Sequence, residues 1–201
     1  RQAAFKAAQD SDSLYFEYVV TAGDQGNGDV NSSISVGTLA LNGGTIKDAA
    51  GNDAVLTLNS IEDTVGVFVD TTAPTITSVT VPANGSYGVG QNLNFVLNTS
   101  ETVVVNTASG TPYLNITIGA TARQATWVTG NSSTAQTFRY TVQTGDQDTD
   151  GITIGTLVTN GGTLKDGAGN DLALTLNSVG NSSGILVDGS VPTVTLTSTA
   201  T

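Results

Sequence analysis

The chain has 201 residues, of which 38% are hydrophobic and 11% are charged, and it contains no cysteine, histidine or methionine. The absence of these residues excludes disulfides, thiol chemistry, imidazole general bases, and zinc or haem sites. Seventeen acidic residues outnumber six basic ones, and the net charge of −11 argues against nucleic acid or an anionic membrane surface as a partner. β-Branched residues combined with threonine, asparagine and glycine are typical of β-proteins.

The sequence repeats itself, and the spacing between equivalent residues changes along the chain. R-Q-A-A-F at 1–5 returns as R-Q-A-T-W at 123–127, an offset of 122. N-G-G-T-I-K-D-A-A-G-N-D at 42–53 returns as N-G-G-T-L-K-D-G-A-G-N-D at 160–171, an offset of 118. The first copy therefore carries four more residues (122 − 118) after Gly23, where we expect a loop.

The two copies end with similar junctions, which divide the chain. V-D-T-T-A-P lies at 69–74, and V-D-G-S-V-P lies at 187–192. We therefore expect one complete repeat at 71–188. Residues 1–70 are then the later part of a preceding repeat, and residues 189–201 are the first strand of a following one.

Within the complete repeat, short segments of alternating apolar and polar residues are separated by turns rich in glycine, asparagine and serine. This pattern predicts an all-β antiparallel sandwich and no helix. The bulky core candidates are Phe95, Trp127, Phe138 and Tyr140, with Phe5, Phe16 and Tyr18 in the corresponding places of the first copy. The expected strands are 75–81, 92–98, 113–118, 122–128, 136–143, 152–158 and a last one formed by 172–177 with 184–188.

Asp146, Asp148 and Asp150 alternate ahead of a glycine, as in the first half of an EF-hand calcium loop. No helix is expected beside them, and position twelve falls on Leu157 instead of the bidentate glutamate. The loop is therefore half a site, and Asp188 or a residue of the next module is expected to complete it. The first copy has a different spacing of acids in this segment.

Seven strands of alternating direction would place this loop at the C-terminal end of the module and the loop at 166–171 at the N-terminal end. Head-to-tail stacking then brings acids of neighbouring modules together, where they repel unless a cation lies between them. Ca²⁺ fits because it takes six to eight oxygen ligands in flexible geometry. The candidate ligands are Asp24, Asp29, Asp70, Asp146, Asp148, Asp150, Asp166, Asn170, Asp171 and Asp188, with Asp48, Asn52 and Asp53 in the first copy.

Two features of this set have simpler interpretations. Aspartate and asparagine favour β-turns without any metal, because they tolerate left-handed conformations and bond their own backbone. Arg1 and Arg123 recur as well, and we interpret them as strand-surface residues.

The V-D-T-T-A-P junction, the N-G-G-T-[IL]-K-D-x-A-G-N-D loop and the G-D-x-x-x-D turn together resemble the tandem Ig-like repeats of giant Gram-negative surface adhesins, including RTX-type proteins. The resemblance covers essentially the whole chain. It implies Greek-key sandwiches of about 118–122 residues per repeat, stiffened by Ca²⁺ at the joints. It also implies an extracellular spacer on the bacterial cell surface, whose partners are neighbouring repeats of the same or an adjacent chain and which holds a distal adhesion domain away from the cell.

Other functions stay open. The threonine-rich strand at 75–80 could belong to a carbohydrate-binding or ice-binding module, although there is one tryptophan and the threonine spacing is irregular. A filament subunit could polymerise by β-strand donation, because P-T-V-T-L-T-S at 192–198 aligns with P-T-I-T-S-V-T at 74–80 and residues 1–70 lack three strands. We expect no enzyme, because the acids lie in turns and the chain has neither histidine nor cysteine. No apolar run approaches the roughly 18 residues that span a bilayer.

Overall fold

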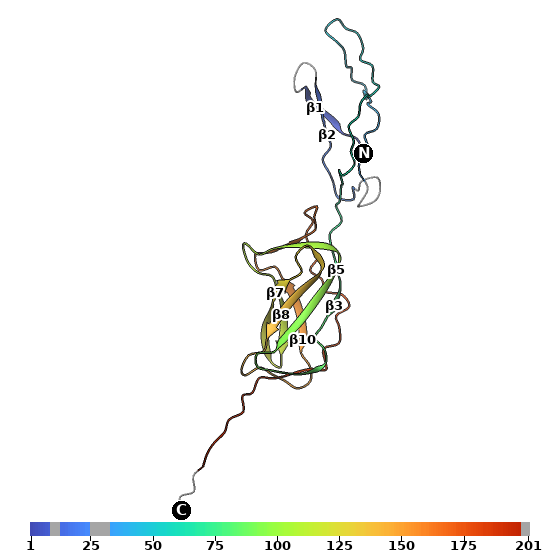
Figure 1. The fold of residues 1–201 in the computed structure, drawn as a ribbon. Helices are drawn as coiled ribbons and strands as arrows, with labels where there is room; N and C mark the ends of the chain where they lie inside the picture. The colour runs from blue at the N-terminus through green and yellow to red at the C-terminus, as the bar shows by residue number, and fades with distance from the viewer. Residues whose placement is uncertain (9–12, 25–32, 198–201) are drawn as a thin grey trace, which may run out of the picture. The chain divides into compact units, whose positions relative to one another are not determined.

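The computed structural model describes residues 1–8, 13–24 and 33–197 (Figure 1). Every regular element in these ranges is a β-strand, so the fold is all-β, as the sequence predicts. The chain divides into two compact units, Arg1–Thr72 and Ala73–Thr201, which are described separately below. Among the described residues, no helix has the length and hydrophobicity that crossing a membrane would require.

The first unit contains one regular antiparallel hairpin, and its remaining described segments are tied by isolated bridges. β1 (Ala4–Ala8) pairs with β2 (Leu14–Glu17), and Phe5 lies opposite Phe16. The two rings meet edge to face with their centroids 5.8 Å apart. Phe5 nevertheless remains 55% exposed.

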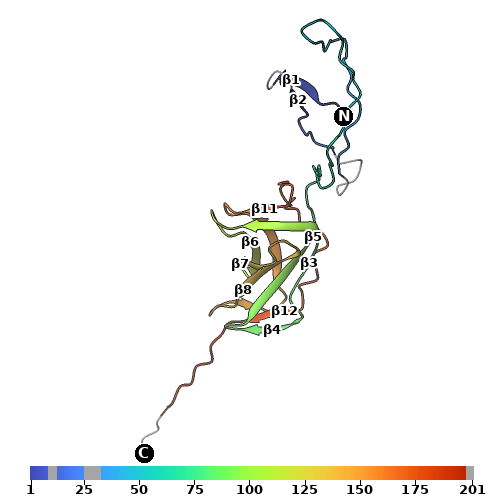
Figure 2. The same cartoon turned by 45° about the horizontal axis from the view of Figure 1, so that its top comes forward.

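The second unit is a β-sandwich built from two sheets, in which most neighbouring strands are antiparallel. The larger sheet has the strand order β10-β6-β7-β8-β5-β11, with β3 paired to β5. The smaller sheet has the order β4-β12-β9, and β4 lies parallel to β12 (Figure 2). The strands are β3 (Ile76–Thr80), β4 (Gly85–Gly88), β5 (Asn92–Asn106), β6 (Tyr113–Ile118), β7 (Thr121–Thr129), β8 (Ser133–Thr141), β9 (Gln147–Asp148), β10 (Thr153–Val158), β11 (Thr163–Lys165) and β12 (Ile185–Asp188).

The expected strands have counterparts, with three differences. The strand expected at 92–98 continues to Asn106 as β5, because the chain shifts register between Asn98 and Val103 and its second half pairs with β11. The short strands β4, β9 and β11 were not expected, since two to four residues are too few to show alternation. The segment at 172–177 is not a regular strand, and single parallel bridges join residues 173 and 179 to the β3 side.

The aromatic residues predicted for the core of the second unit lie in or against that core. Phe95 and Phe138 are fully buried and lie opposite each other on β5 and β8. Trp127 packs against the core, and its ring N–H donates to the Gln136 side-chain oxygen at 3.1 Å. The buried Gln136 amide in turn donates to two backbone carbonyls at 2.7 and 2.8 Å, so its burial leaves no donor unsatisfied. The other buried residues include Ile76, Val79, Leu93, Leu97, Leu114, Ile116, Ile118, Val142, Ile152, Leu157, Ile185 and Val187.

Candidate functional site: the acidic loops

The Asp146 carboxylate is buried, and protein donors surround it. Its Oδ1 accepts from Arg123 Nε at 2.8 Å, and Arg123 Nη2 lies 2.7 Å from the same oxygen. Its Oδ2 accepts from the Tyr140 hydroxyl at 2.6 Å and from the Gln143 backbone amide at 2.8 Å. A carboxylate offers about four lone-pair positions, so these contacts fill it. This bonding favours a structural role for Asp146 over the calcium ligation that the aspartate spacing predicts.

The same contacts shift the ionisation of the groups involved. Burial raises the pKa of Asp146, but the bonds from Tyr140, the Gln143 amide and Arg123 outweigh burial, and the pKa lies below its ordinary value. Burial and the bond to Asp146 raise the pKa of Tyr140 to about 12. The Asp146 carboxylate also raises the pKa of Arg123. At neutral pH the network therefore consists of a charged pair and a neutral phenol.

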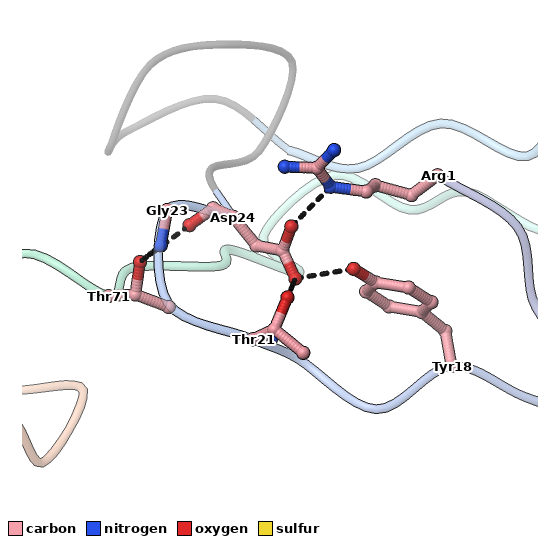
Figure 3. A network of polar contacts seen from close by, with 6 residues as sticks. All are labelled: Arg1, Tyr18, Thr21, Gly23, Asp24 and Thr71. Atoms are coloured by element: carbon pink, nitrogen blue, oxygen red, sulfur yellow. Dashed lines mark hydrogen bonds and ion pairs between the residues drawn. The ribbon is translucent and has the colours of Figure 1, made fainter.

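The first unit contains an equivalent network, offset by 122 residues (Figure 3). Asp24 is 3% exposed, and its carboxylate accepts hydrogen bonds from the Arg1 guanidinium, from the Tyr18 hydroxyl at 2.5 Å and from the Thr21 amide at 2.7 Å. These bonds, that from Tyr18 first, hold the pKa of the Asp24 carboxyl well below its usual range. The predicted ligand Asp29 lies outside the described residues.

In the second unit, the backbone beside Asp146 is bonded to the residue that follows β12. The Gly145 amide donates to the Gly189 carbonyl at 3.0 Å, and the Gly189 amide donates to the Asp146 carbonyl at 2.6 Å. A Cβ added at Gly189 would lie 2.4 Å from the Gln143 carbonyl oxygen, so no side chain fits there. We call these contacts the linker latch, because they fix the chain where it leaves the sandwich.

The first unit forms its linker latch with a side chain. Thr71 occupies the position equivalent to Gly189, and its hydroxyl accepts from the Gly23 amide at 3.0 Å. The same hydroxyl donates to the Asp24 carbonyl at 3.0 Å. Both units therefore bond the residue after the junction aspartate, Asp70 or Asp188, to the loop that carries the buried aspartate, although they use different chemical groups to do so.

Asp148 and Gly151 have structural roles in the loop that resembles an EF-hand. Asp148 is 5% exposed, and its carboxylate accepts from the Gly119 amide at 2.6 Å and from the Gly151 amide at 2.7 Å. Gly151 has a φ of 106°, and a Cβ there would lie 2.4 Å from the Ser183 Cα. Turn closure and close backbone packing thus account for Asp148 and Gly151 of this pattern. Asp150, by contrast, is exposed.

The loop at 166–171 is closed by its own side chains. Oδ1 of Asp166 accepts from two backbone amides of the loop at 2.8 and 2.9 Å, and Oδ2 accepts from the Asn170 side-chain amide at 2.7 Å. Lys165 Nζ lies 2.6 Å from the Asp171 carboxylate. Of the predicted ligands, Asn170 therefore acts as a donor to Asp166, and Asp171 pairs with a lysine.

The first copy closes its version of this loop in the same way. The Asp48 carboxylate accepts from the Asn52 backbone amide at 2.8 Å and from its side-chain amide at 2.8 Å. The Asn52 side chain, followed by its backbone amide, lowers the pKa of Asp48. Lys47 Nζ lies 2.5 Å from the Asp53 carboxylate. The repeated K-D-x-A-G-N-D sequence is therefore explained by hydrogen bonds and an ion pair inside each loop.

Glu101, which the sequence analysis did not select, lies beside Asp166. The two side chains offer carboxylate oxygens within 4.8 Å of each other. Two carboxylates at this distance repel unless a proton or a cation reduces their charge. Ca²⁺ takes six to eight oxygen ligands, so the two residues fit part of a calcium site and would need further oxygens.

The two acidic loops lie at opposite ends of the second unit, as the strand directions predict. β9 (Gln147–Asp148) pairs with β12, which places the first loop beside Asp188. The loop at 166–171 lies beside the start of the unit, where the Ala173 amide donates to the Pro74 carbonyl at 2.9 Å.

The aspartates of the two junctions bond to the backbone that follows them. Asp188 accepts from the Ser190 amide at 3.0 Å and from the Gln147 side-chain amide at 2.9 Å. These bonds, that from Ser190 first, lower the pKa of Asp188. Asp70 accepts from the Thr72 amide at 2.8 Å. The position of Asp70 relative to the acids of the second unit stays a prediction.

Sequence reasoning missed the partners of the buried aspartates. It interpreted Arg123 as a strand-surface residue and Tyr140 as a packing residue, and joined neither to Asp146. A signal for this network was present, since all three residues recur at one offset of 122.

No protein-family model matches the chain, and neither a curated protein nor a solved structure matches it. The resemblance to adhesin repeats therefore depends on the motifs quoted above. The chemistry of the described loops is that of buried carboxylates held by protein donors, together with one close pair of carboxylates.

Proposed function

We propose that the chain consists of Ig-like spacer modules of an adhesin on the bacterial cell surface. The linker latch is the observation that most supports this function, because it occurs at equivalent positions in both units. A spacer must hold its exit segment in a fixed direction relative to its own core if it is to pass orientation to the next module. Each unit bonds its exit residue to the loop of its buried aspartate.

The same networks favour a structural protein over an enzyme. The buried carboxylates of Asp24, Asp146 and Asp148 are bonded to arginine, tyrosine, threonine or backbone donors. A carboxylate that acts as a general acid, a general base or a nucleophile must reach a substrate. We therefore assign no reaction to these residues.

Calcium enters this proposal at the N-terminal end of the second unit. Glu101 and Asp166 would supply carboxylate oxygens, and further oxygen ligands would complete the coordination. Bound there, the ion would neutralise the two acids and stiffen this end of the module. Asp146, whose carboxylate is filled, and Asp171, which pairs with a lysine, do not belong to this reduced set.

The test is thermal unfolding of the whole chain in EDTA and in millimolar Ca²⁺, with small-angle scattering on the same samples. Trp127 is the single tryptophan and lies in the second unit, so its fluorescence reports that unit. An ion present at 100 times its Kd stabilises the folded state by about 2.7 kcal/mol. We expect Ca²⁺ to raise the Tm and to give a longer, stiffer particle.

Two variants locate the ion. Glu101→Gln should lose the calcium-dependent rise in Tm, whereas Asp150→Asn, which removes an exposed acid from the other end of the unit, should keep it. Equal calcium responses in both variants would show that the ion binds elsewhere. If Ca²⁺ changes neither Tm nor particle length in the unmodified chain, calcium has no part in the joints and only the spacer function is left.

A further inference from the structure

The strands that form the broad face of the larger sheet contain no acidic residue, although the second unit as a whole is acidic. No aspartate or glutamate occurs in β6, in β7, in β8 or in the first half of β5 (92–98). All the acids of the second unit lie outside these segments, and they are Glu101, Asp146, Asp148, Asp150, Asp166, Asp171 and Asp188. The face of the sheet therefore differs in charge from the acidic loops.

Four side chains form one row across this face. β6, β7, β8 and β5 are neighbours in that order (Figure 2). Tyr113 of β6 lies opposite Thr126 of β7, and Thr126 lies opposite Arg139 of β8. Arg139 in turn lies opposite Asn94 of β5. Each of the four lies between residues that are buried or packed against the core, so all four side chains point away from the core.

Arg139 is the cation of this row, and the protein orients it without neutralising it. Its Nε donates to the Asn94 side-chain oxygen at 2.8 Å. The other five basic residues of the chain each form an ion pair with an aspartate or a glutamate, whereas no carboxylate of the described residues pairs with Arg139. Because the Arg139 side chain is exposed and is held through Nε, its two Nη groups are accessible to a ligand.

The first unit indicates that the repeat does not require an arginine at this position. Glu17 is the equivalent of Arg139 at the offset of 122, and it lies opposite Ala4, the equivalent of Thr126. The Glu17 carboxylate lies 3.0 Å from Lys6 Nζ, so the first unit neutralises the charge at this position itself. The arginine without a carboxylate partner is therefore a feature of the second unit and not of the repeat.

The chemistry of the row matches that of an acidic sugar. An arginine binds a carboxylate through two parallel N–H bonds. Asn94 and Thr126 supply an amide and a hydroxyl for sugar hydroxyls, and the Tyr113 ring offers apolar surface to the C–H groups of a sugar ring. Tyr113 and Arg139 are two strand spacings apart, about 10 Å, which two linked sugar rings can span.

The same composition argues against a protein as the occupant. Protein interfaces depend on several buried aromatic or apolar anchors. The row has one aromatic ring, and its other side chains are polar. Its single positive charge on a surface without acids is instead complementary to a carboxylate.

We propose that this row binds a polysaccharide of uronic acids. Arg139 binds a carboxylate of the sugar chain, Asn94 and Thr126 bond neighbouring hydroxyls, and Tyr113 stacks on an adjacent ring. The second unit is then a binding module in its own right. This binding requires neither calcium nor the spacer function.

Titration calorimetry of the whole chain with oligogalacturonate and with oligoglucuronate tests the class of ligand. The buffer contains EDTA, so that calcium cannot bridge the sugar to the acids of the protein. We expect at least one of the two acidic oligosaccharides to bind, and its methyl ester, which keeps the rings but not the charge, to bind at least tenfold more weakly. Equal binding of acid and ester would overturn carboxylate recognition, and binding of neither oligosaccharide would overturn the proposal as a whole.

Acetate is titrated as well, because it supplies a carboxylate without a sugar. We expect its affinity to be at least tenfold lower than that of the oligosaccharide. If acetate binds as tightly, Arg139 is an anion site only and the assignment to a glycan is wrong.

Variants locate the site. Arg139→Gln should weaken binding at least tenfold, and Tyr113→Leu, which keeps an apolar side chain but removes the ring, should weaken it at least fivefold. The matched control is Lys165→Gln, which removes a cation of the same unit that lies outside the row, and it should bind as the unmodified chain does. Trp127 fluorescence checks that each variant is folded. Equal losses in Arg139→Gln and Lys165→Gln would show general charge attraction, and unchanged binding in Arg139→Gln would overturn the site.

Sedimentation over a range of concentrations tests a second copy of the chain as the occupant. We expect the unmodified chain and Arg139→Gln to sediment alike. If the unmodified chain associates and Arg139→Gln abolishes this association, the row is an interface between copies and the glycan proposal is wrong.

Discussion

Substitution of Asp146 by asparagine tests whether this buried carboxylate holds the second unit together. Asparagine keeps the size of the side chain but replaces one acceptor oxygen by an NH₂ group. Whichever way the amide is turned, the NH₂ group faces either the Arg123 guanidinium or the Gln143 backbone amide, and both of these groups can only donate. The substitution therefore places donors against donors in a buried position.

The expected loss follows from the contacts that are broken. A buried polar group that loses its partner costs about 1–3 kcal/mol. Removal of one member of a buried ion pair costs about 3–5 kcal/mol, but the Arg123 side chain is 31% exposed, so water compensates part of this loss. We therefore expect Asp146→Asn to lower the free energy of unfolding by about 3 kcal/mol, which is a fall in Tm of about 10 °C for a unit of this size.

Unfolding followed by Trp127 fluorescence measures this loss in the second unit alone. The control is Asp150→Asn, which removes an exposed acid from the same loop and should change stability by less than about 0.5 kcal/mol. Both variants are measured in EDTA and in millimolar Ca²⁺. If Asp146→Asn is as stable as the control, or if its loss appears only with Ca²⁺, the structural role of Asp146 is refuted.

The pH dependence and the glycines of the second unit give two further tests. Because the pKa of Asp146 is lowered, its stabilising contribution is present above about pH 4 and is lost as the pH falls through the lowered value. Because the pKa of Tyr140 is raised to about 12, its contribution is present below about pH 10 and is lost toward pH 12, and Tyr140→Phe should show a smaller alkaline fall in Tm. An unchanged alkaline fall in this variant would contradict the assignment. Gly151→Ala should cost more than about 2 kcal/mol because of its positive φ and the close Ser183 backbone, whereas Gly167→Ala, which meets no atom within 4 Å, should change stability by less than about 0.5 kcal/mol in urea unfolding. Equal effects of the two alanines would show that the close packing at Gly151 does not matter.

The strands that could be predicted are those in which the alternation of apolar and polar residues matches the alternation of buried and exposed side chains. β6 was predicted with its observed bounds, because every second residue from Leu114 to Ile118 is buried. β4, β9 and β11 could not be predicted, since these short segments form strands only by pairing with partners that lie far away in sequence. β9 has two residues, for example, and it is a strand only because Asp148 lies opposite Val187 of β12.

The acidic loops were placed at the correct ends of the second unit, but the bonds of their carboxylates were not predictable from loop spacing. Alternating aspartates followed by glycine have the same spacing in a metal loop and in a closed turn. The difference lies in donors from distant residues: Arg123 lies 23 positions before Asp146, and Gly119 lies 29 positions before Asp148. A motif confined to one loop carries no information about such donors.

The two offsets of the repeat indicate that protein contacts, and not calcium, hold the segment by which the chain leaves each unit. Asp24 and Asp146 belong to the part that repeats at 122, whereas Thr71 and Gly189 belong to the part that repeats at 118. The linker latch joins these two parts in both units, so it tolerates the four-residue difference between the copies. A calcium loop depends on fixed spacing between successive ligands, which this difference breaks. We therefore propose that the buried aspartate networks fix the exit segment and that calcium binds at the opposite end of the sandwich, where Glu101 lies beside Asp166.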